Sequence, residues 1–170
     1  MRPIVLGLGN DLLADDAIGL LVARRVQEMA GDEVDAVECR CAGLSLLDPL
    51  AGRTHAIIVD AIVTAHQPPG TIDRITPAAI RHVTNLSPHY AGLPEVIRMA
   101  HHLGLAFPEE IEIIAIEAED VTTIGGGLTP AVAGVLDEVI RKVIETVERW
   151  RMPKPIVTKP APDFRPRPAT

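Results

Sequence analysis

Short apolar runs alternate along most of the chain with longer stretches in which apolar residues recur every three or four positions. The short runs are typical of strands buried in a sheet, and the longer spacing is typical of helices that pack against one. The predicted strands are 4–8, 34–40, 55–61, 70–76 and 110–117. The predicted helices are 18–29, 44–50, 93–103 and 132–147. This alternation predicts a three-layer α/β/α domain, in which a mostly parallel, twisted sheet is flanked by helices on both faces.

Residues 153–170 differ in composition from the rest of the chain. Six of these 18 residues are proline, and four Lys or Arg residues accompany a single Asp. Such a segment buries too little apolar surface to offset the entropy that ordering it would remove. We therefore expect one α/β domain over residues 1–152 and a mobile, basic, proline-rich tail over residues 153–170. We expect the tail to be inert, with a docking arm as the alternative.

The overall composition excludes several classes of protein. Of the 170 residues, 47% are apolar and 23% are charged, as in globular domains, so a disordered chain is excluded. Aromatic residues make up 2% and the net charge is −7, which argues against binding to nucleic-acid bases or phosphates. No apolar stretch approaches the ~20 residues of a membrane span, and the first apolar run lacks the features of a signal peptide. We expect a cytoplasmic protein with neither nucleic-acid nor membrane partners.

Side chains suited to nucleophilic catalysis are scarce. The chain has two serines, and neither lies in a G-x-S-x-G turn. Cys39 and Cys41 alternate along a predicted strand, so we expect both on one face, buried as small apolar side chains. A reactive thiol or a metal ligand is the alternative for this pair.

Three loops that follow apolar runs carry acidic or imidazole side chains. They hold Asp15 and Asp16 after the first strand, Asp60 at the end of the third, and His89 before the second long helix. Ligands of parallel sheets bind beyond the carboxyl ends of the strands, so two carboxylates and one imidazole that meet there would suit a divalent metal such as nickel, zinc or iron. Plainer interpretations stay open: Asp15 or Asp16 could cap a helix, Asp60 could be a solvated turn residue, and His89 could be structural.

Residues 7–19 (GLGNDLLADDAIG) resemble the N-terminal signature of the hydrogenase maturation endopeptidases, which process the large subunit of nickel-iron hydrogenases. Further motifs of that family have counterparts here in the same order. They are the Gly-x-x-Leu-Leu segment at 43–47, the acid-ending strand at 57–61, the Ser-Pro-His loop at 87–89 with Gly-Leu at 92–93, and the helix start at 127–132. The resemblance covers about residues 3–149, nearly all of the predicted domain.

The resemblance implies an endopeptidase that removes a C-terminal extension from the precursor of a nickel-iron hydrogenase large subunit after nickel has been inserted. The metal-contacting residues of the family fall on Asp16, Asp60 and His89, which we expect to be both the catalytic residues and the metal ligands. The precursor is expected to carry the nickel, and zinc or cadmium to occupy the same site in vitro. The ion could polarise the scissile carbonyl, with Asp16 or Asp60 as general base, or it could serve for recognition alone. An aspartic-type mechanism that uses both carboxylates is also open.

Some questions stay open at this point. A non-catalytic nickel- or precursor-binding chaperone on the same fold is the alternative function, and a small-molecule hydrolase is a weaker one. The chain has Arg40-Cys41-Ala42 where some relatives have Asp-Gly-Gly-Thr, so the wall that selects the substrate differs. Which hydrogenase is processed, and the oligomeric state, do not follow from the sequence.

Overall fold

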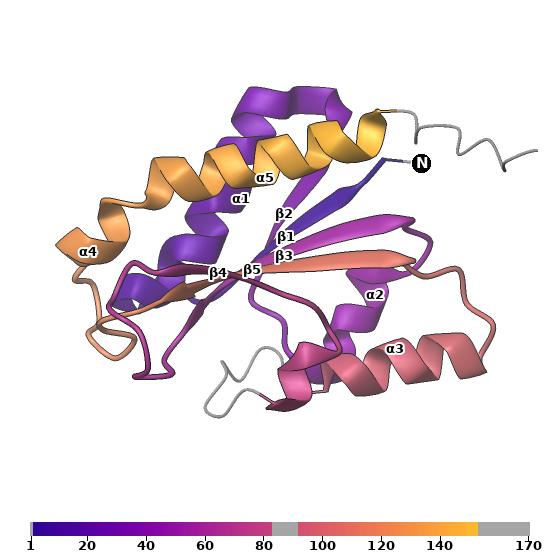
Figure 1. Ribbon diagram of the computed structural model, residues 1–170, viewed down its shortest axis with the longest axis horizontal. Helices are drawn as coiled ribbons and strands as arrows, with labels where there is room; N and C mark the ends of the chain where they lie inside the picture. The colour runs from indigo at the N-terminus through magenta and orange to yellow at the C-terminus, as the bar shows by residue number, and fades with distance from the viewer. Residues whose placement is uncertain (1, 83–91, 153–170) are drawn as a thin grey trace, which may run out of the picture.

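The computed structural model describes residues 2–82 and 92–152, and it is built around one five-stranded sheet (Figure 1). The strands are β1 (Ile4–Leu8), β2 (Asp35–Cys39), β3 (His55–Ile62), β4 (Ile72–Ile75) and β5 (Glu110–Glu117). Their order across the sheet is β2-β1-β3-β5-β4, in which only β4 runs antiparallel to its neighbour. The expected α/β fold with a mostly parallel sheet is confirmed. The predicted tail at 153–170 and His89 lie outside the described residues.

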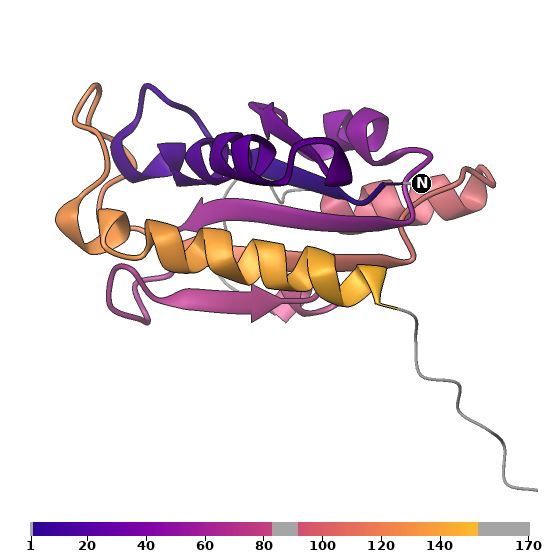
Figure 2. The ribbon, with the colours of Figure 1, turned by 90° about the horizontal axis from the view of Figure 1, so that it is seen from above.

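Helices cover both faces of the sheet, as Figures 1 and 2 show. On one face α1 (Ile18–Ala30) and α5 (Leu136–Arg151) lie side by side, and on the other α2 (Leu47–Leu50) and α3 (Leu93–His102) pack. The short helical elements are η1 (Ala14–Ala17), η2 (Gly31–Glu33), η3 (Gly43–Leu46), η4 (Ala79–His82) and α4 (Pro130–Ala133). Within the described ranges, no helix has the length and apolar character that a membrane crossing requires.

The central strand β3 shows why the apolar runs in the sequence are continuous. Side chains of a strand alternate between the two faces of a sheet, and here both faces are covered. Ile57 and Val59 belong to the apolar core under α1 and α5, whereas Ile58 and Ile62 belong to the core under α2 and α3. Each face needs an apolar side chain at every second position of the strand. Because both faces are covered, apolar residues follow one another without the alternating polar positions of a half-exposed strand.

Glycines allow α1 to lie close to β1. A Cβ atom on Gly7 would overlap the backbone carbonyl of Gly19, and one on Gly19 would overlap the carbonyl oxygens of Leu8 and Val59. Gly7 therefore has a packing role, because only glycine lets the helix approach the strands this closely.

The last predicted helix differs from the structure. The apolar period from 132 to 147 predicts one continuous helix, but α4 ends at Ala133 and α5 begins at Leu136. Val135 between them has φ −105° and ψ −2°, away from the values of a regular α-helix, and it follows Gly134. Glycine and β-branched residues both weaken a helix, and together they end the first one here. The predicted start is confirmed, with Thr129 as N-cap and Pro130 in the first turn.

Candidate active site

The loop between β1 and η1 places Asp16 at the carboxyl end of the sheet. Gly9 has φ +140°, and a Cβ atom there would overlap the carbonyl oxygen of Asp16. That oxygen accepts a hydrogen bond from the amide of Asn10 at 3.3 Å, and the Asn10 side chain accepts one from the amide of Leu12 at 3.1 Å. The loop is thereby folded back on itself, and Asp16 is half-buried on η1.

Asp15, the preceding acid, is fully buried and faces a different set of partners. Its Oδ2 accepts hydrogen bonds from the amides of Glu119 at 2.9 Å and Asp120 at 3.0 Å, in the loop after β5. Thr129, the N-cap of α4, donates from its amide to Oδ1 at 2.7 Å and from its hydroxyl to Oδ2 at 3.0 Å. The interpretation of Asp15 as a helix cap is wrong, because its carboxylate joins η1 to two distant segments instead.

Asp60 lies inside β3 and is fully buried. The strand continues to Ile62, one residue beyond its predicted end, and the interpretation of Asp60 as a solvated turn residue is wrong. Asp60 pairs with Ala115 of β5, and its neighbour Val59 pairs with Gly7 of β1. It shares a face with Ile58 and Ile62, two residues away on either side. A carboxylate thus stands on an otherwise apolar strand, near its carboxyl end.

The structure brings the element that carries Asp16 next to the strand that carries Asp60, because η1 contacts β3. His89 lies within 83–91, outside the described residues, so its convergence with the two acids stays a prediction. The described chain resumes at Gly92, the N-cap of α3, where an added Cβ would stand 3.2 Å from the Cα of Gly43. Over residues 2–82 and 92–152, no three His, Cys, Asp or Glu side chains form a cluster that could hold a metal.

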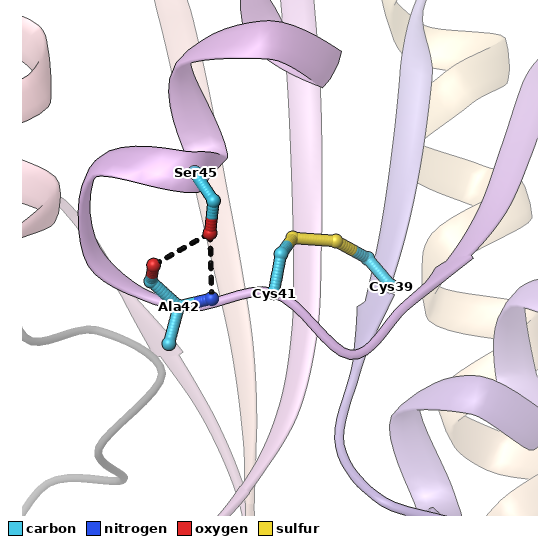
Figure 3. Close-up of a disulfide and its surroundings, with 4 residues drawn as sticks. All are labelled: Cys39, Cys41, Ala42 and Ser45. Carbon is cyan, nitrogen blue, oxygen red and sulfur yellow. Dashed lines mark hydrogen bonds between the residues drawn. A yellow bond between two sulfur atoms is a disulfide. The ribbon is translucent and has the colours of Figure 1, made fainter.

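The wall of the site beside β2 is closed by a disulfide between Cys39 and Cys41 (Figure 3). The expectation of two fully buried free thiols is therefore wrong, because the sulfur atoms are bonded to each other and both residues are only half-buried. Both do pack against the apolar core under α2 and α3. The turn that follows is held by Ser45, whose Oγ accepts from the Ala42 amide at 3.1 Å and donates to the Ala42 carbonyl at 2.7 Å (Figure 3). Cys39 pairs with Leu8 at the end of β1, so the disulfide stands at the carboxyl edge of the sheet.

A third buried carboxylate at this edge, after Asp15 and Asp60, was not expected from the sequence. Glu117, the last residue of β5, accepts hydrogen bonds from the amides of Thr64 and Ala65, both at 2.8 Å, and from the Thr64 hydroxyl at 2.7 Å. Its carboxylate therefore holds the turn after β3 and is buried away from solvent. The sequence did contain a signal for Glu117, because it is an acid at the end of an apolar strand. The same signal pointed to Asp60.

The loop after β5 is stabilised by its own acid. Hydrogen bonds from the side chain of Thr123, and from the backbone and side chain of Thr122, hold the pKa of Asp120 well below its usual range. The carboxylate of Asp120 accepts from the Thr122 hydroxyl at 2.9 Å and from the Thr123 amide at 3.0 Å. This turn shapes the segment whose amides bind Asp15.

Known proteins with similar sequences are hydrogenase maturation proteins. The hydrogenase maturation protease family (HycI) matches residues 20–146. The hydrogenase 2 maturation protease of Escherichia coli K12 is 33% identical over 150 residues, which cover 85% of this chain and 89% of that protein. The hydrogenase expression/formation protein HupD of Rhodobacter capsulatus is 31% identical over 155 residues, 88% of this chain and 72% of that protein.

A solved structure agrees with these relatives. The hydrogenase maturating endopeptidase HybD from Escherichia coli superposes with a TM-score of 0.76 at 32% identity, covering 89% of this chain and 94% of that one. The fold and the relatives define an enzyme of the peptidase class. The chain belongs to the hydrogenase maturation protease family, which confirms the resemblance seen in the sequence.

Proposed function

We propose that this peptidase removes a C-terminal extension from the precursor of a nickel-iron hydrogenase large subunit after nickel insertion. Asp16, Asp60 and His89 would meet the nickel that the precursor carries, so that cleavage depends on metal loading. The family and the maturation role in the names of the relatives support this proposal. We place the reaction in the cytoplasm, where we expect the precursor to receive its metal.

The observation that carries the proposal is the position of Asp60. A carboxylate that is removed from water strongly disfavours its ionised form, and a nearby positive charge reverses that preference. Asp60 is fully buried on an apolar strand, and the element that carries Asp16 lies against that strand. A divalent ion presented by the precursor at this edge would be attracted by both carboxylates, whose charge is opposite to its own.

The two acids differ in what they can reach. Asp16 is half-buried on a short helix at the surface, so it can contact the water that attacks the scissile amide, and we assign it the role of general base. Asp60, with no exposed surface, would hold the metal. An ion held by Asp60 and the imidazole of His89, with Asp16 beside it, would keep open positions for precursor groups and would polarise a bound carbonyl. Asp16 takes the proton of the attacking water and returns it to the departing amine as the C–N bond breaks.

The test uses purified precursor in two forms, loaded with nickel and free of nickel, and follows the loss of the C-terminal extension by mass spectrometry. We expect shortening of the loaded form only. Equal cleavage of both forms would refute the dependence on nickel, and stable binding of the loaded precursor without any mass change would identify the chain as a maturation chaperone. Asp16→Ala, Asp60→Ala and His89→Ala are each expected to abolish cleavage, and normal processing by any one of them removes that residue from the site.

A further inference from the structure

We propose that Asp15 is a positioning residue for the cleavage reaction: through its four hydrogen bonds it holds η1 and thereby sets the direction of the Asp16 side chain. This inference rests on the proposed function, because it assumes that Asp16 acts on the precursor. It assigns a task to a buried carboxylate that does not itself reach the substrate.

The short helix is held from several sides. Asp15 donates its amide to the carbonyl of Asp120 at 2.8 Å, and Ala14 donates its amide to the carbonyl of Thr123 at 3.0 Å. Leu13 forms an isolated antiparallel bridge with Ile124, so the loop after β5 follows η1 over several residues. The Asp15 carboxylate adds bonds to the same loop and to the start of α4. One side chain thus joins η1 to two segments that lie more than a hundred positions further along the chain.

Because Asp15 and Asp16 are neighbours on η1, the position of the Asp15 side chain determines the direction in which Asp16 points. A 3₁₀ helix has three residues per turn, so neighbouring side chains point in directions about 120° apart. With Asp15 fixed in the interior, Asp16 must project from a different side of the same turn. The solvent exposures agree, because Asp15 is fully buried and Asp16 is not. A small rotation of η1 would turn Asp16 away, and a misplacement of about 1 Å can slow an enzyme on the order of a hundredfold.

Thr129 offers a way to loosen this anchor without removing the carboxylate. Although it is the N-cap of α4, its hydroxyl makes no bond to that helix and donates to Asp15 instead. Thr129→Val removes the donor and keeps the shape of the side chain. Thr129→Ser keeps the donor and is the conservative variant that should restore function.

Glu117 provides a matched control in the same part of the molecule. It is also a buried carboxylate that accepts a threonine hydroxyl, from Thr64 at 2.7 Å, but its partners lie in the turn after β3 and not in η1. Thr64→Val therefore removes the hydroxyl bond to Glu117, together with the bond that this hydroxyl accepts from the His66 amide at 3.2 Å, without touching the helix that carries Asp16. A purely structural role for Asp15 predicts that the two valine variants behave alike.

The experiment compares kcat and KM for nickel-loaded precursor among the three variants, together with the melting temperature and the NMR shift of the Asp16 amide. We expect Thr129→Val to lower kcat about tenfold with KM within about twofold, and Thr129→Ser to restore kcat. Thr64→Val should lower the melting temperature similarly but keep kcat and the Asp16 amide shift. Equal kcat values and unmoved Asp16 shifts in both valine variants would overturn the positioning role. Failure of the unmodified chain to cleave would refute the proposed function, while the amide shifts would still report on the positioning of Asp16.

Discussion

The guanidinium of Arg40 contacts the carboxylate of Asp11 at 2.6 Å and links the end of β2 to the loop between β1 and η1. Arg40 stands between the two half-cystines, at the place where the sequence departs from the pattern of some relatives. The pair lines a depression of about 610 Å³ together with Gly9, Asn10 and Leu12. The depression is lined by the loop that leads into η1, which carries Asp16. We therefore expect the charge of Arg40 to act on the precursor.

Arg40→Ala should weaken recognition of the precursor and leave the fold intact. Both partners are exposed, and an exposed ion pair contributes about 0–1 kcal/mol to stability. We expect KM to rise about threefold to tenfold with kcat unchanged, because the lost contact binds ground state and transition state alike. Steady-state kinetics with nickel-loaded precursor measures this change.

A second exposed arginine supplies the control for this prediction. Arg25 pairs with Glu28 at 3.1 Å on α1 and is exposed to a similar extent, but it lies outside the depression. Arg25→Ala should change neither KM nor kcat. If both variants raise KM equally, the effect is one of net charge and the depression has no special part in recognition.

The disulfide between Cys39 and Cys41 should stabilise the fold only slightly. It closes a ring of three residues, and the chain-entropy contribution of so short a loop is about 1–2 kcal/mol. We expect the double variant Cys39→Ser, Cys41→Ser to lose this amount of unfolding free energy, and a dithiol reductant to cause the same loss in the unmodified chain. Chemical denaturation with and without reductant measures both.

The double variant also provides the control for reduction. A dithiol should not alter its unfolding free energy, since it has no bond left to reduce. A loss well above 2 kcal/mol in the unmodified chain alone would show that the disulfide organises more of the β2 wall than its own ring.

Asp120 should make the stability of the chain depend on pH in the acidic range. Its pKa is lowered in the fold by the Thr123 and Thr122 hydrogen bonds, whereas an unfolded chain has a value of about 3.9. A carboxyl with a depressed folded pKa contributes stability above its unfolded pKa, and that contribution is lost as the pH falls below it. The advantage of the unmodified chain over Asp120→Asn should therefore shrink between about pH 5 and about pH 3.

The contributions of the other acids to the pH dependence cancel when the unfolding free energies of the unmodified chain and of Asp120→Asn are subtracted at each pH. One such acid is Glu38, whose pKa is also lowered, by the hydrogen bond from Arg24. Urea unfolding curves at several pH values give the comparison. A constant difference across the range would show that the turn around Asp120 does not favour the ionised carboxylate.

The fold was predictable because its signals are local. The three inner strands, β1, β3 and β5, are largely apolar runs in the sequence, and the run at 110–117 coincides with β5 residue by residue. The helical periods likewise indicated α1 and α3 to within a few residues. The break at Gly134 was missed, because a helix interrupted by one turn keeps nearly the same apolar period on either side.

The candidate site was predictable only in part. Position relative to strand ends singled out Asp16 and Asp60, but it could not separate Asp16 from Asp15. That distinction depends on a 3₁₀ turn and on donors in Glu119 and Thr129, more than a hundred positions away. The burial of Asp60 was missed for a related reason, since an acid interrupts an apolar run in the sequence even where the strand continues to Ile62.

The two acids of the site should respond differently when each is lengthened by one methylene group. Asp16 is half-buried at the surface of η1, so a longer side chain there can bend toward solvent and return its carboxylate to the same place, and Asp16→Glu should keep cleavage within about tenfold. Asp60 has no exposed surface, and an extra methylene in a packed interior destabilises by about 1–3 kcal/mol. We expect Asp60→Glu to lose at least about a hundredfold in kcat/KM, because the carboxylate is displaced by about 1 Å. Precursor cleavage and denaturant unfolding measured on the same preparations check both parts, and equal tolerance at the two positions would contradict the assignment of Asp60 to a rigid metal-holding site.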